Sequence, residues 1–220
     1  MSSTTELRED RDDRRQRPDA TPAPAESTPQ IADPGPLGLA AFALTTFVLS
    51  LFNIGIAPEA LEPVVLPLAL FYGGVAQFLA GMWEFRKGNT FGATAFSSYG
   101  AFWIAFAAYV KFIEPELLAS GATESEVKVA TGIFLVGWAL FTLYMFIASL
   151  RTNAGLIAVF LTLFLTFLSL AIADLAGLSG LAVVGGILGL LSALAAWYTS
   201  AAVVTNSTWG RTVMPVGPRS

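Results

Sequence analysis

The stretch GMWEFRKGNTFGATAFSSYGAFW, residues 81–103, decides the fold of this chain. Three charged residues, Glu84, Arg86 and Lys87, stand there between two long apolar runs. Basic residues in a short connection mark a place where a hydrophobic chain leaves the membrane and turns back. A glycine and an asparagine follow them and supply the turn. We therefore predict two membrane-spanning helices joined by a short polar hairpin.

The composition of the whole chain supports this interpretation. Of its 220 residues, 55% are hydrophobic and 13% are charged, and the mean hydropathy is +0.65. A soluble core is disfavoured, because the sequence lacks the polar faces that would cover so much apolar surface. We predict an all-α integral membrane protein, whose six transmembrane helices occupy residues 34–210. A spanning helix needs roughly 20 apolar residues, and the runs of about that length are 38–57, 64–83, 91–112, 129–150, 154–173 and 178–204.

The two ends of the chain differ from this apolar middle. Residues 1–33 are rich in Arg, Asp, Glu, Pro, Ser and Thr and nearly free of aromatic residues. Such a segment cannot bury enough surface to fold alone. We predict that residues 1–33 form a disordered, charged and Pro-rich cytoplasmic tail and that residues 211–220 form a short cytoplasmic C-terminal tail. A secretory signal is not expected, because no short apolar region follows the first charges.

The basic residues predict the orientation. With both termini in the cytoplasm, the inner segments hold ten of the twelve Lys and Arg residues, and the outer segments hold only Lys111 and Lys128. Basic residues in short connections remain preferentially on the cytoplasmic side. We therefore expect a multi-pass protein of the cytoplasmic (inner) membrane with both termini inside.

Polar side chains continue into the third apolar run, where hydrocarbon should surround the chain. Counting 1.5 Å per residue from Thr90 places Tyr99 roughly 14 Å deep, near the bilayer middle. In one interpretation Thr94, Ser97 and Ser98 bond back to helix carbonyls and Tyr99 caps a neighbouring helix. In the other these side chains line a hydrated path, which we favour because they cluster at such depth.

Glycines and small residues shape the helices. Gly73 and Gly74 weaken the second helix, and the prolines of the stretch 33–39 fix an extended approach to the first. The last run carries Gly185 and Gly189 on a stripe of small residues. Such stripes allow close backbone approach within a protomer or between protomers. The sequence leaves both arrangements open.

The residues that are missing narrow the function. The chain has no Cys and no His, which excludes thiol catalysis, thiolate metal sites, Ser-His triads and histidine proton relays. Its Gly-rich stretches lack the Lys and Ser or Thr of a phosphate loop. Glu84 and Asp174 stand at the ends of apolar runs and can both be interfacial. We expect no enzyme, hence no catalytic residue, no cofactor, no metal and no nucleic-acid partner.

Four motifs occur in order: DPGPLGL (33–39), LTTFVLSLFNIG (44–55), FYGGVAQFLAGMWEFRKGNTFGATAFSSYGAFW (71–103) and WGRTVMPVG (209–217). Together they resemble the acetate uptake transporter family, which includes bacterial succinate/acetate transporters of the YaaH type and fungal acetate and ammonia-export proteins. The resemblance implies a six-helix protomer in a lipid bilayer, assembled as a homo-hexamer. It also implies a path through each protomer for acetate and related short carboxylates, including succinate in some members. Proton-coupled carriage and channel-like flow are both compatible with it.

The resemblance also implies a narrow constriction at Phe42, Tyr99 and Leu163. Leu163 lies nine residues after Ala154 and so comes near the membrane middle, like Tyr99. Phe42, counted from Gly38, is only about one turn inside. Either the first helix starts deeper, or Phe42 lies below the other two residues.

This chain departs from the usual family motif at its first helix. The motif residues are Asp33, Pro34, Gly35, Pro36, Leu37, Gly38 and Leu39. Family members usually have Asn and Ala where Asp33 and Gly35 stand, and a His where this chain has Phe52. Asp33 can still cap the helix, but it loses an amide donor and adds a charge. A proton route through the histidine position is absent.

A carboxylate in a narrow dry pore must meet hydrogen-bond donors or cross as the neutral acid. The predicted path residues that can donate are Asn53, Gln77, Thr94, Ser97 and Ser98. With no Lys or Arg at depth, binding would be weak and release easy, and pore width would set selectivity. Two other functions remain open. One is a pore for a neutral solute such as urea, ammonia or acetic acid, and the other is a non-transporting membrane sensor or scaffold that acts through its tail.

Overall fold

The computed structural model of the chain describes residues 31–217. The predicted N-terminal tail lies almost wholly outside the described residues. From Asp33 onward the chain forms one helical unit. Six segments of the described range are long and apolar enough to cross a membrane, which confirms the predicted fold class. They are Gly35–Asn53, Glu59–Lys87, Thr90–Ala119, Glu124–Ser149, Ala154–Ala176 and Ser179–Trp209.

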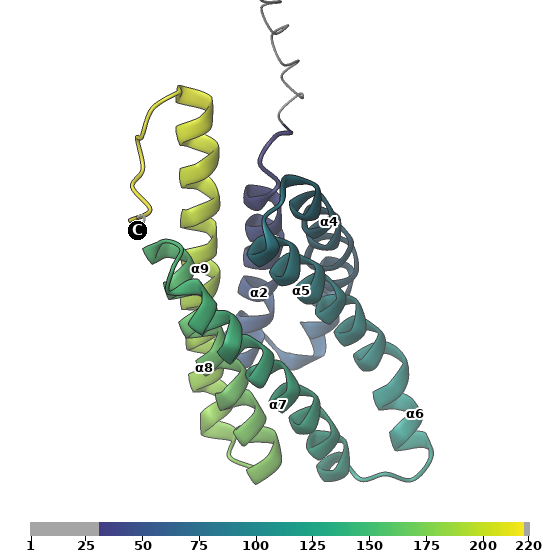
Figure 1. Cartoon of the computed structure of the whole chain (residues 1–220). Helices are drawn as coiled ribbons and strands as arrows, with labels where there is room; N and C mark the ends of the chain where they lie inside the picture. Colours follow the sequence, from purple (N-terminus) through teal and green to yellow (C-terminus); the bar gives the residue numbers. More distant parts are fainter. Residues whose placement is uncertain (1–30, 218–220) are drawn as a thin grey trace, which may run out of the picture. The chain divides into compact units, whose positions relative to one another are not determined.

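Four of these spans are single α-helices (Figure 1): α2 (Gly35–Asn53), α7 (Glu124–Ser149), α8 (Ala154–Ala176) and α9 (Ser179–Trp209). The other two are composite. The second span consists of the 3₁₀-helix η1 (Glu59–Val64), α3 (Val65–Pro67), the π-helix η2 (Leu68–Ala76) and α4 (Gln77–Lys87). The third consists of α5 (Thr90–Ala108), the π-helix η3 (Tyr109–Ile113) and α6 (Glu114–Ala119).

The predicted glycine break in the second span is a wide π-helix that remains part of a continuous helical rod. Gly73 of η2 faces both α2 and α5. A Cβ atom at Gly73 would lie 2.6 Å from Thr45 Oγ1 and 2.9 Å from Trp103 Cδ1. Because no side chain fits there, this glycine lets η2 pack directly between the two other helices.

The hairpin predicted from the opening stretch is confirmed. Gly88 ends α4 in the left-handed conformation, with φ of 79°, which glycine adopts without strain. Asn89 then caps α5, and its Oδ1 accepts a hydrogen bond of 3.1 Å from Gly92 N. The two helices stay close beyond the turn, because a Cβ atom at Gly81 would overlap the backbone nitrogen and hydroxyl of Ser97.

α9 packs along both α2 and α8, and α7 packs along the other side of α8. The stripe of small residues on α9 makes these contacts. A Cβ atom at Gly185 would lie 2.7 Å from the side chain of Leu170 on α8, and one at Gly189 would overlap Ser50 Oγ on α2. This stripe therefore serves packing within the chain.

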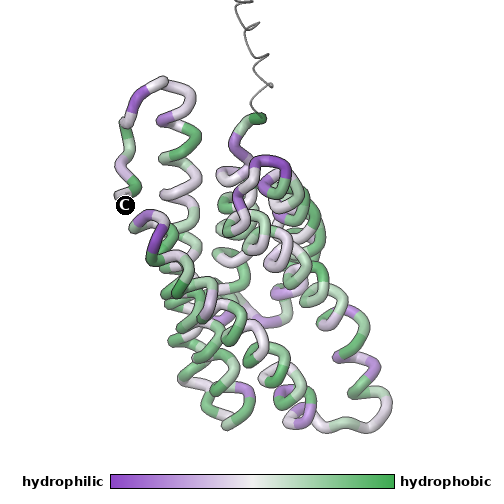
Figure 2. Tube along the Cα trace, viewed as in Figure 1, coloured by the Kyte–Doolittle hydropathy of each residue, from purple (hydrophilic) through white to green (hydrophobic). Residues whose placement is uncertain are grey.

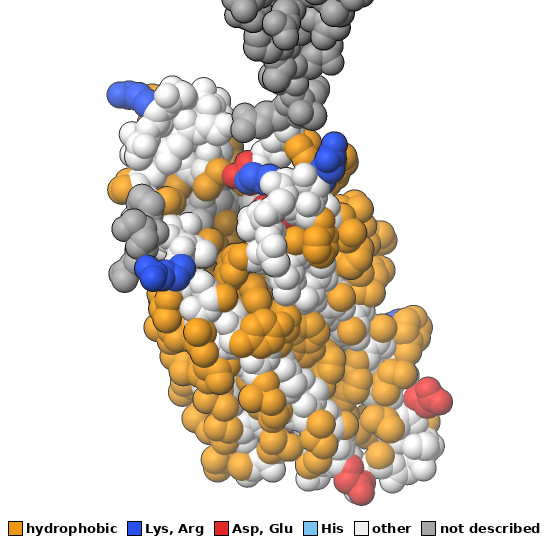
Figure 3. Space-filling model, viewed as in Figure 1, with side chains coloured by type: hydrophobic (Ala, Val, Ile, Leu, Met, Phe, Trp, Pro, Cys, Tyr) orange, Lys and Arg blue, Asp and Glu red, His pale blue; other side chains and the backbone are white. Residues whose placement is uncertain are grey.

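We call the end at which α2 begins and α9 ends the terminal end of the unit. The α4–α5 hairpin lies at the same end, as the element order requires. Hydrophobic residues dominate the helices, with hydrophilic residues concentrated near their ends (Figure 2). On the face shown in Figure 3, apolar side chains cover the middle, most Lys and Arg side chains lie toward the terminal end, and acidic side chains lie at both ends.

After α9 the chain folds back toward the start of α8. Asn206 holds this return, since its Nδ2 donates to Met214 O at 2.8 Å and its Oδ1 accepts from Val213 N at 2.7 Å. The backbone nitrogen of Ala154, the first residue of α8, donates to Gly217 O at 3.0 Å. The C-terminal segment thus supplies an acceptor for a helix terminus that would otherwise lack one.

Candidate functional site: two cavities and the layer between them

Two cavities lie inside the described helical unit. The first opens among the residues of the terminal end and has a volume of about 160 Å³. The second lies beside residues of the opposite end and has a volume of about 450 Å³. Three residues line both cavities, namely Phe42 of α2, Tyr99 of α5 and Leu163 of α8. They are the residues for which the sequence predicts a constriction.

These shared residues form a closed layer. Phe42, Tyr99 and Leu163 are 4%, 3% and 3% exposed, so no open channel joins the cavities through them. The rings of Phe42 and Tyr99 have centroids 6.2 Å apart. α2 begins at Gly35, three residues before the Gly38 from which the depth of Phe42 was counted. We call these three residues the closed layer.

Tyr99 is held from the side by α7. Its hydroxyl lies 2.8 Å from Thr142 Oγ1, and Thr142 Oγ1 donates its own proton to Trp138 O at 2.7 Å. Tyr99 must therefore be the donor in the first bond. Its ring also packs against Phe141, with centroids 5.3 Å apart. Because the hydroxyl proton of Tyr99 is donated within the protein, Tyr99 contributes its aromatic ring to the closed layer and has no proton left to donate to a solute.

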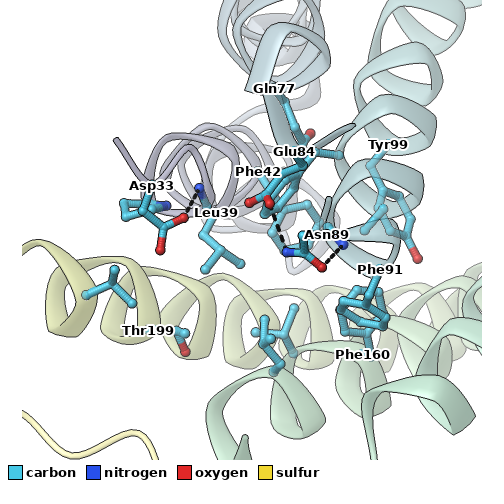
Figure 4. A pocket seen from close by; sticks show the side chains of 18 of the residues that line it. Asp33, Leu39, Phe42, Gln77, Glu84, Asn89, Phe91, Tyr99, Phe160 and Thr199 are labelled. Atoms are coloured by element: carbon cyan, nitrogen blue, oxygen red, sulfur yellow. Dashed lines mark hydrogen bonds between the residues drawn. The ribbon is translucent and has the colours of Figure 1, made fainter. Parts of the chain in front are cut away.

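The first cavity has a polar wall on α4 and the hairpin (Figure 4). Gln77 and Glu84 lie seven residues apart on one face of α4 and are each 1% exposed. Glu84 Oε2 accepts a 2.8 Å hydrogen bond from Asn89 Nδ2. Glycine makes room for this carboxyl group, since a Cβ atom at Gly92 would lie 2.9 Å from Glu84 Cδ.

The predicted Asp33–Leu39 motif forms part of the mouth of the first cavity. Asp33 Oδ1 accepts from Gly35 N, at the start of α2, at 2.9 Å and lies 2.8 Å from Lys87 Nζ of α4. Pro34, and not Asp33, is the N-cap residue of α2. Asp33, Gly35, Pro36 and Leu39 line the cavity. Pro34, Leu37 and Gly38 do not, and Gly38 instead packs under the Phe96 ring.

The predicted path residues are distributed unequally. Gln77 lines the first cavity and Asn53 the second. Thr94, Ser97 and Ser98 line neither of these two cavities. Ser97 lies against Gly81 in the α4–α5 contact, and its Oγ is 4.0 Å from Met82 Sδ. Ser97 thus belongs to the contact between α4 and α5 rather than to either of the two cavities.

Glu84 is the residue whose environment differs most from the sequence interpretation. A charge at a helix end suggests an interfacial position, yet Glu84 is buried and faces the cavity. The sequence could have indicated this burial through Asn89, because a cap residue directly after the turn can reach back to a side chain at the end of the preceding helix.

Charged side chains line the mouth of the second cavity. Glu59 and Glu62 come from η1, Glu114 from α6, Asp174 from α8 and Lys128 from α7. Four carboxylates against one ammonium group make this mouth acidic. The first cavity is lined by two carboxyl groups, Asp33 and Glu84, and by one ammonium group, Lys87, which pairs with Asp33.

Six spanning helices around two cavities that share one closed layer define a multi-pass helical membrane protein built for passage across the bundle. The chain belongs to the GPR1/FUN34/yaaH family, whose match covers residues 15–218. The resemblance drawn from the sequence motifs is thereby confirmed, and the match begins earlier than the expected residue 33.

Relatives of known name support the same assignment. The chain is 45% identical over 197 residues to "Acetate permease A" of Emericella nidulans, covering 85% of this chain and 66% of that protein. It is 40% identical over 188 residues to "Succinate-acetate/proton symporter SatP" of Escherichia coli, covering 86% of this chain and 96% of that one. A solved structure described as the bacterial acetate channel SatP matches with a TM-score of 0.77 and 41% identity, over 85% of this chain and 99% of that chain.

Proposed function

We propose that this protein moves acetate and related short carboxylates, including succinate, across a membrane. The path runs through the two cavities and the closed layer of Phe42, Tyr99 and Leu163. The observation that carries the proposal is that these three residues line both cavities, so a displacement of their side chains would join the two spaces. The names of the relatives supply the substrate class.

The closed layer sets the chemistry of passage. Phe42 and Leu163 have apolar side chains, and the hydroxyl proton of Tyr99 is occupied by Thr142. A carboxylate that crosses it loses water without gaining a fixed cation, which favours small solutes that stay in the layer only briefly. Selectivity then follows from the width of the layer and from polar groups on either side, such as Gln77 in the first cavity and Asn53 in the second.

Orientation and assembly are part of the proposal. The terminal end, with Arg86, Lys87 and Arg151, faces the cytoplasm of a cell whose cytoplasmic (inner) membrane holds the protein. The protein works as a homo-hexamer, as the family resemblance implies. Ala101 and Ala105 of α5 are exposed small residues suited to contacts between protomers. The relatives are named as transporters or channels, and we infer that this chain is likewise not an enzyme.

The test is uptake of labelled acetate into proteoliposomes that contain the full chain, with and without an inward proton gradient. Wild-type protein is compared with Tyr99→Ala, which opens the layer, and with Tyr144→Ala as a control. Tyr144 is 51% exposed on α7 and lines neither of the two cavities. Uptake that Tyr99→Ala changes and Tyr144→Ala does not supports the proposed path.

The gradient separates the two mechanisms. Uptake that needs it indicates proton-coupled carriage, and uptake without it indicates a channel. Solute flux without charge movement in a parallel electrical recording supports the neutral-solute pore, which stays an alternative because no Lys or Arg lines the closed layer. Absence of any acetate uptake by well-folded wild-type protein would overturn the proposal and favour a sensor or scaffold.

A further inference from the structure

The helices of the described unit form a series of packed neighbours. α7 packs against α8, α8 against α9, α9 against α2, and both α2 and α5 pack against the second span. Glycine allows close approach in each of these contacts. A Cβ atom at Gly132 of α7 would lie 2.7 Å from Leu175 of α8, and one at Gly100 of α5 would lie 2.6 Å from Phe78 N of α4. Helices that approach this closely interlock through their backbones.

The two ends of this series, α5 and α7, meet in a different way. Among the described glycines, none brings these two helices together. Phe102 contacts Phe134 and Trp138 with ring centroids 5.8 and 5.0 Å apart, and Tyr109 stacks on Phe134 at 6.1 Å. Side chains rather than interlocked backbones therefore close this contact. We call it the aromatic seam, and its rings are Tyr99, Phe102 and Tyr109 of the third span and Phe134, Trp138 and Phe141 of α7.

Two tyrosine–threonine hydrogen bonds cross the aromatic seam. The first is the bond from Tyr99 to Thr142. In the second, the Tyr109 hydroxyl lies 2.8 Å from Thr131 Oγ1, which donates its own proton to Val127 O at 3.1 Å. Tyr109 is therefore the donor of the second bond. Because Thr131 and Thr142 are eleven residues apart, or about three turns of α7, they lie on the same face of the helix.

The aromatic seam is connected to the proposed path. Tyr99 belongs to both the seam and the closed layer, and Phe102 and Thr131 line the second cavity. Movement of α7 away from α5 would separate Tyr99 from Thr142 and Phe141. The closed layer would then lose the lateral support of one of its three residues, while the interlocked helices keep their contacts. Packed elements of this kind shift between discrete arrangements.

We propose that the closed layer opens when the aromatic seam parts, and that Tyr109 and Thr131 are positioning residues that keep the seam closed. This inference rests on the proposed function and specifies which helix contact moves. The pair acts on passage through the position of α7 and hence of Tyr99. Aromatic rings suit this task, because they can separate and return while the glycine contacts of the other helices stay intact.

Reversible cross-linking tests whether the seam must part. The chain has no cysteine, so a double variant with Tyr109→Cys and Thr131→Cys carries the only two thiols. A short bifunctional methanethiosulfonate joins these thiols through disulfides that a reductant cleaves. The full chain is placed in proteoliposomes, and mass spectrometry confirms the joining. We expect joining to abolish most acetate uptake and reduction to restore it.

The matched control joins two helices that already interlock. Phe47 of α2 and Trp197 of α9 have ring centroids 5.1 Å apart and line neither of the two cavities. A double variant with Phe47→Cys and Trp197→Cys receives the same reagent, and joining should leave its uptake unchanged. Each variant is compared with itself before joining and after reduction, so a folding defect caused by the substitutions is not mistaken for locking.

Weakening the seam should have the opposite effect. Tyr109→Phe removes the donor and leaves Thr131 bonded to its own helix. Loss of one hydrogen bond between membrane helices should favour the parted seam and raise the initial rate of acetate uptake about threefold. Tyr198→Phe is the control and should keep the wild-type rate, because the Tyr198 hydroxyl donates to Pro215 O at 2.8 Å, away from the seam. A purely structural role of Tyr109 would lower the rate or leave it unchanged.

The outcomes separate the seam from the function. If wild-type protein takes up acetate and the joined seam variant does so equally well, the seam proposal is wrong and the transport function stands. A Tyr109→Phe rate at or below the wild-type rate would also overturn it, as would an equal block by both cross-links. If wild-type protein shows no uptake, the proposed function itself fails.

Discussion

The hydrogen bond between Tyr99 and Thr142 allows a prediction with a defined sign. Tyr99 donates to Thr142 Oγ1, and Thr142 donates to Trp138 O. Tyr99→Phe removes the first donor and leaves Thr142 still bonded to the carbonyl. Thr142→Val removes the acceptor and leaves a buried tyrosine proton without a partner. Thr142→Val should therefore destabilise the protein more than Tyr99→Phe.

The magnitudes follow from these two situations. Hydrogen bonds between membrane helices contribute about 0.6 kcal/mol on average, which is the loss expected for Tyr99→Phe. An unsatisfied buried donor costs about 1–3 kcal/mol, which is the loss expected for Thr142→Val. In the double variant no donor is left unpaired, so it should be more stable than Thr142→Val alone. Both single changes keep the Tyr99 ring, so acetate uptake should stay within about threefold of wild type, a difference of under 1 kcal/mol.

Reversible unfolding of the purified protein in mixed micelles gives the free energies for this double-mutant cycle. Uptake into proteoliposomes gives the effect on passage. The reasoning would be refuted if Tyr99→Phe proved more damaging than Thr142→Val, or if the double variant were the least stable of the three. A large loss of uptake in Tyr99→Phe would show that the hydroxyl, and not the ring, serves the substrate.

Four further substitutions have expected outcomes. Glu84→Gln keeps an acceptor for Asn89 but can no longer titrate, so the pH profile of acetate uptake should flatten; a profile identical to wild type would remove Glu84 from the path. Gly81→Val should lower the unfolding free energy by about 1–3 kcal/mol or more, because the added side chain would overlap α5. Gly137→Ala is the control: it has open space around it and should stabilise α7 by about 0.5–1 kcal/mol. Similar thermal unfolding of both variants would contradict the packing described. Lys87→Met should change the unfolding free energy by less than about 1 kcal/mol, because the ion pair with Asp33 is solvent-exposed, and a larger change would show that the pair holds α2 and α4 together.

The sequence predicts the six spans because long apolar runs and their polar ends are local features. It also predicts the hairpin, since Gly88 and Asn89 have well-defined turn preferences. The widened winding of η2 is different. Two adjacent glycines show that a helix is weakened, but the side chains against which Gly73 packs, Thr45 and Trp103, come from other helices.

The candidate site shows a similar division. The resemblance supplied Phe42, Tyr99 and Leu163, whereas depth alone suggested Ser97 and its neighbours as path residues. Depth gives no direction around the helix. At about 100° per residue, Ser97 points nearly opposite to Tyr99, and it indeed lies against α4. Helical phase counted from Tyr99 would have separated cavity residues from packing residues.

The π-helix η2 makes the polar wall of the first cavity depend on residue number. Deleting one residue from η2 would turn every later α4 side chain by about 100° relative to the first part of the span. Gln77 and Glu84 would then point away from the cavity although each is unaltered. Substitution scans cannot reveal such a dependence, because the direction of the α4 side chains is set by the number of residues in η2 and not by their types. Among homologous chains, this segment should therefore tolerate changes of residue type outside its two glycines far better than changes of length.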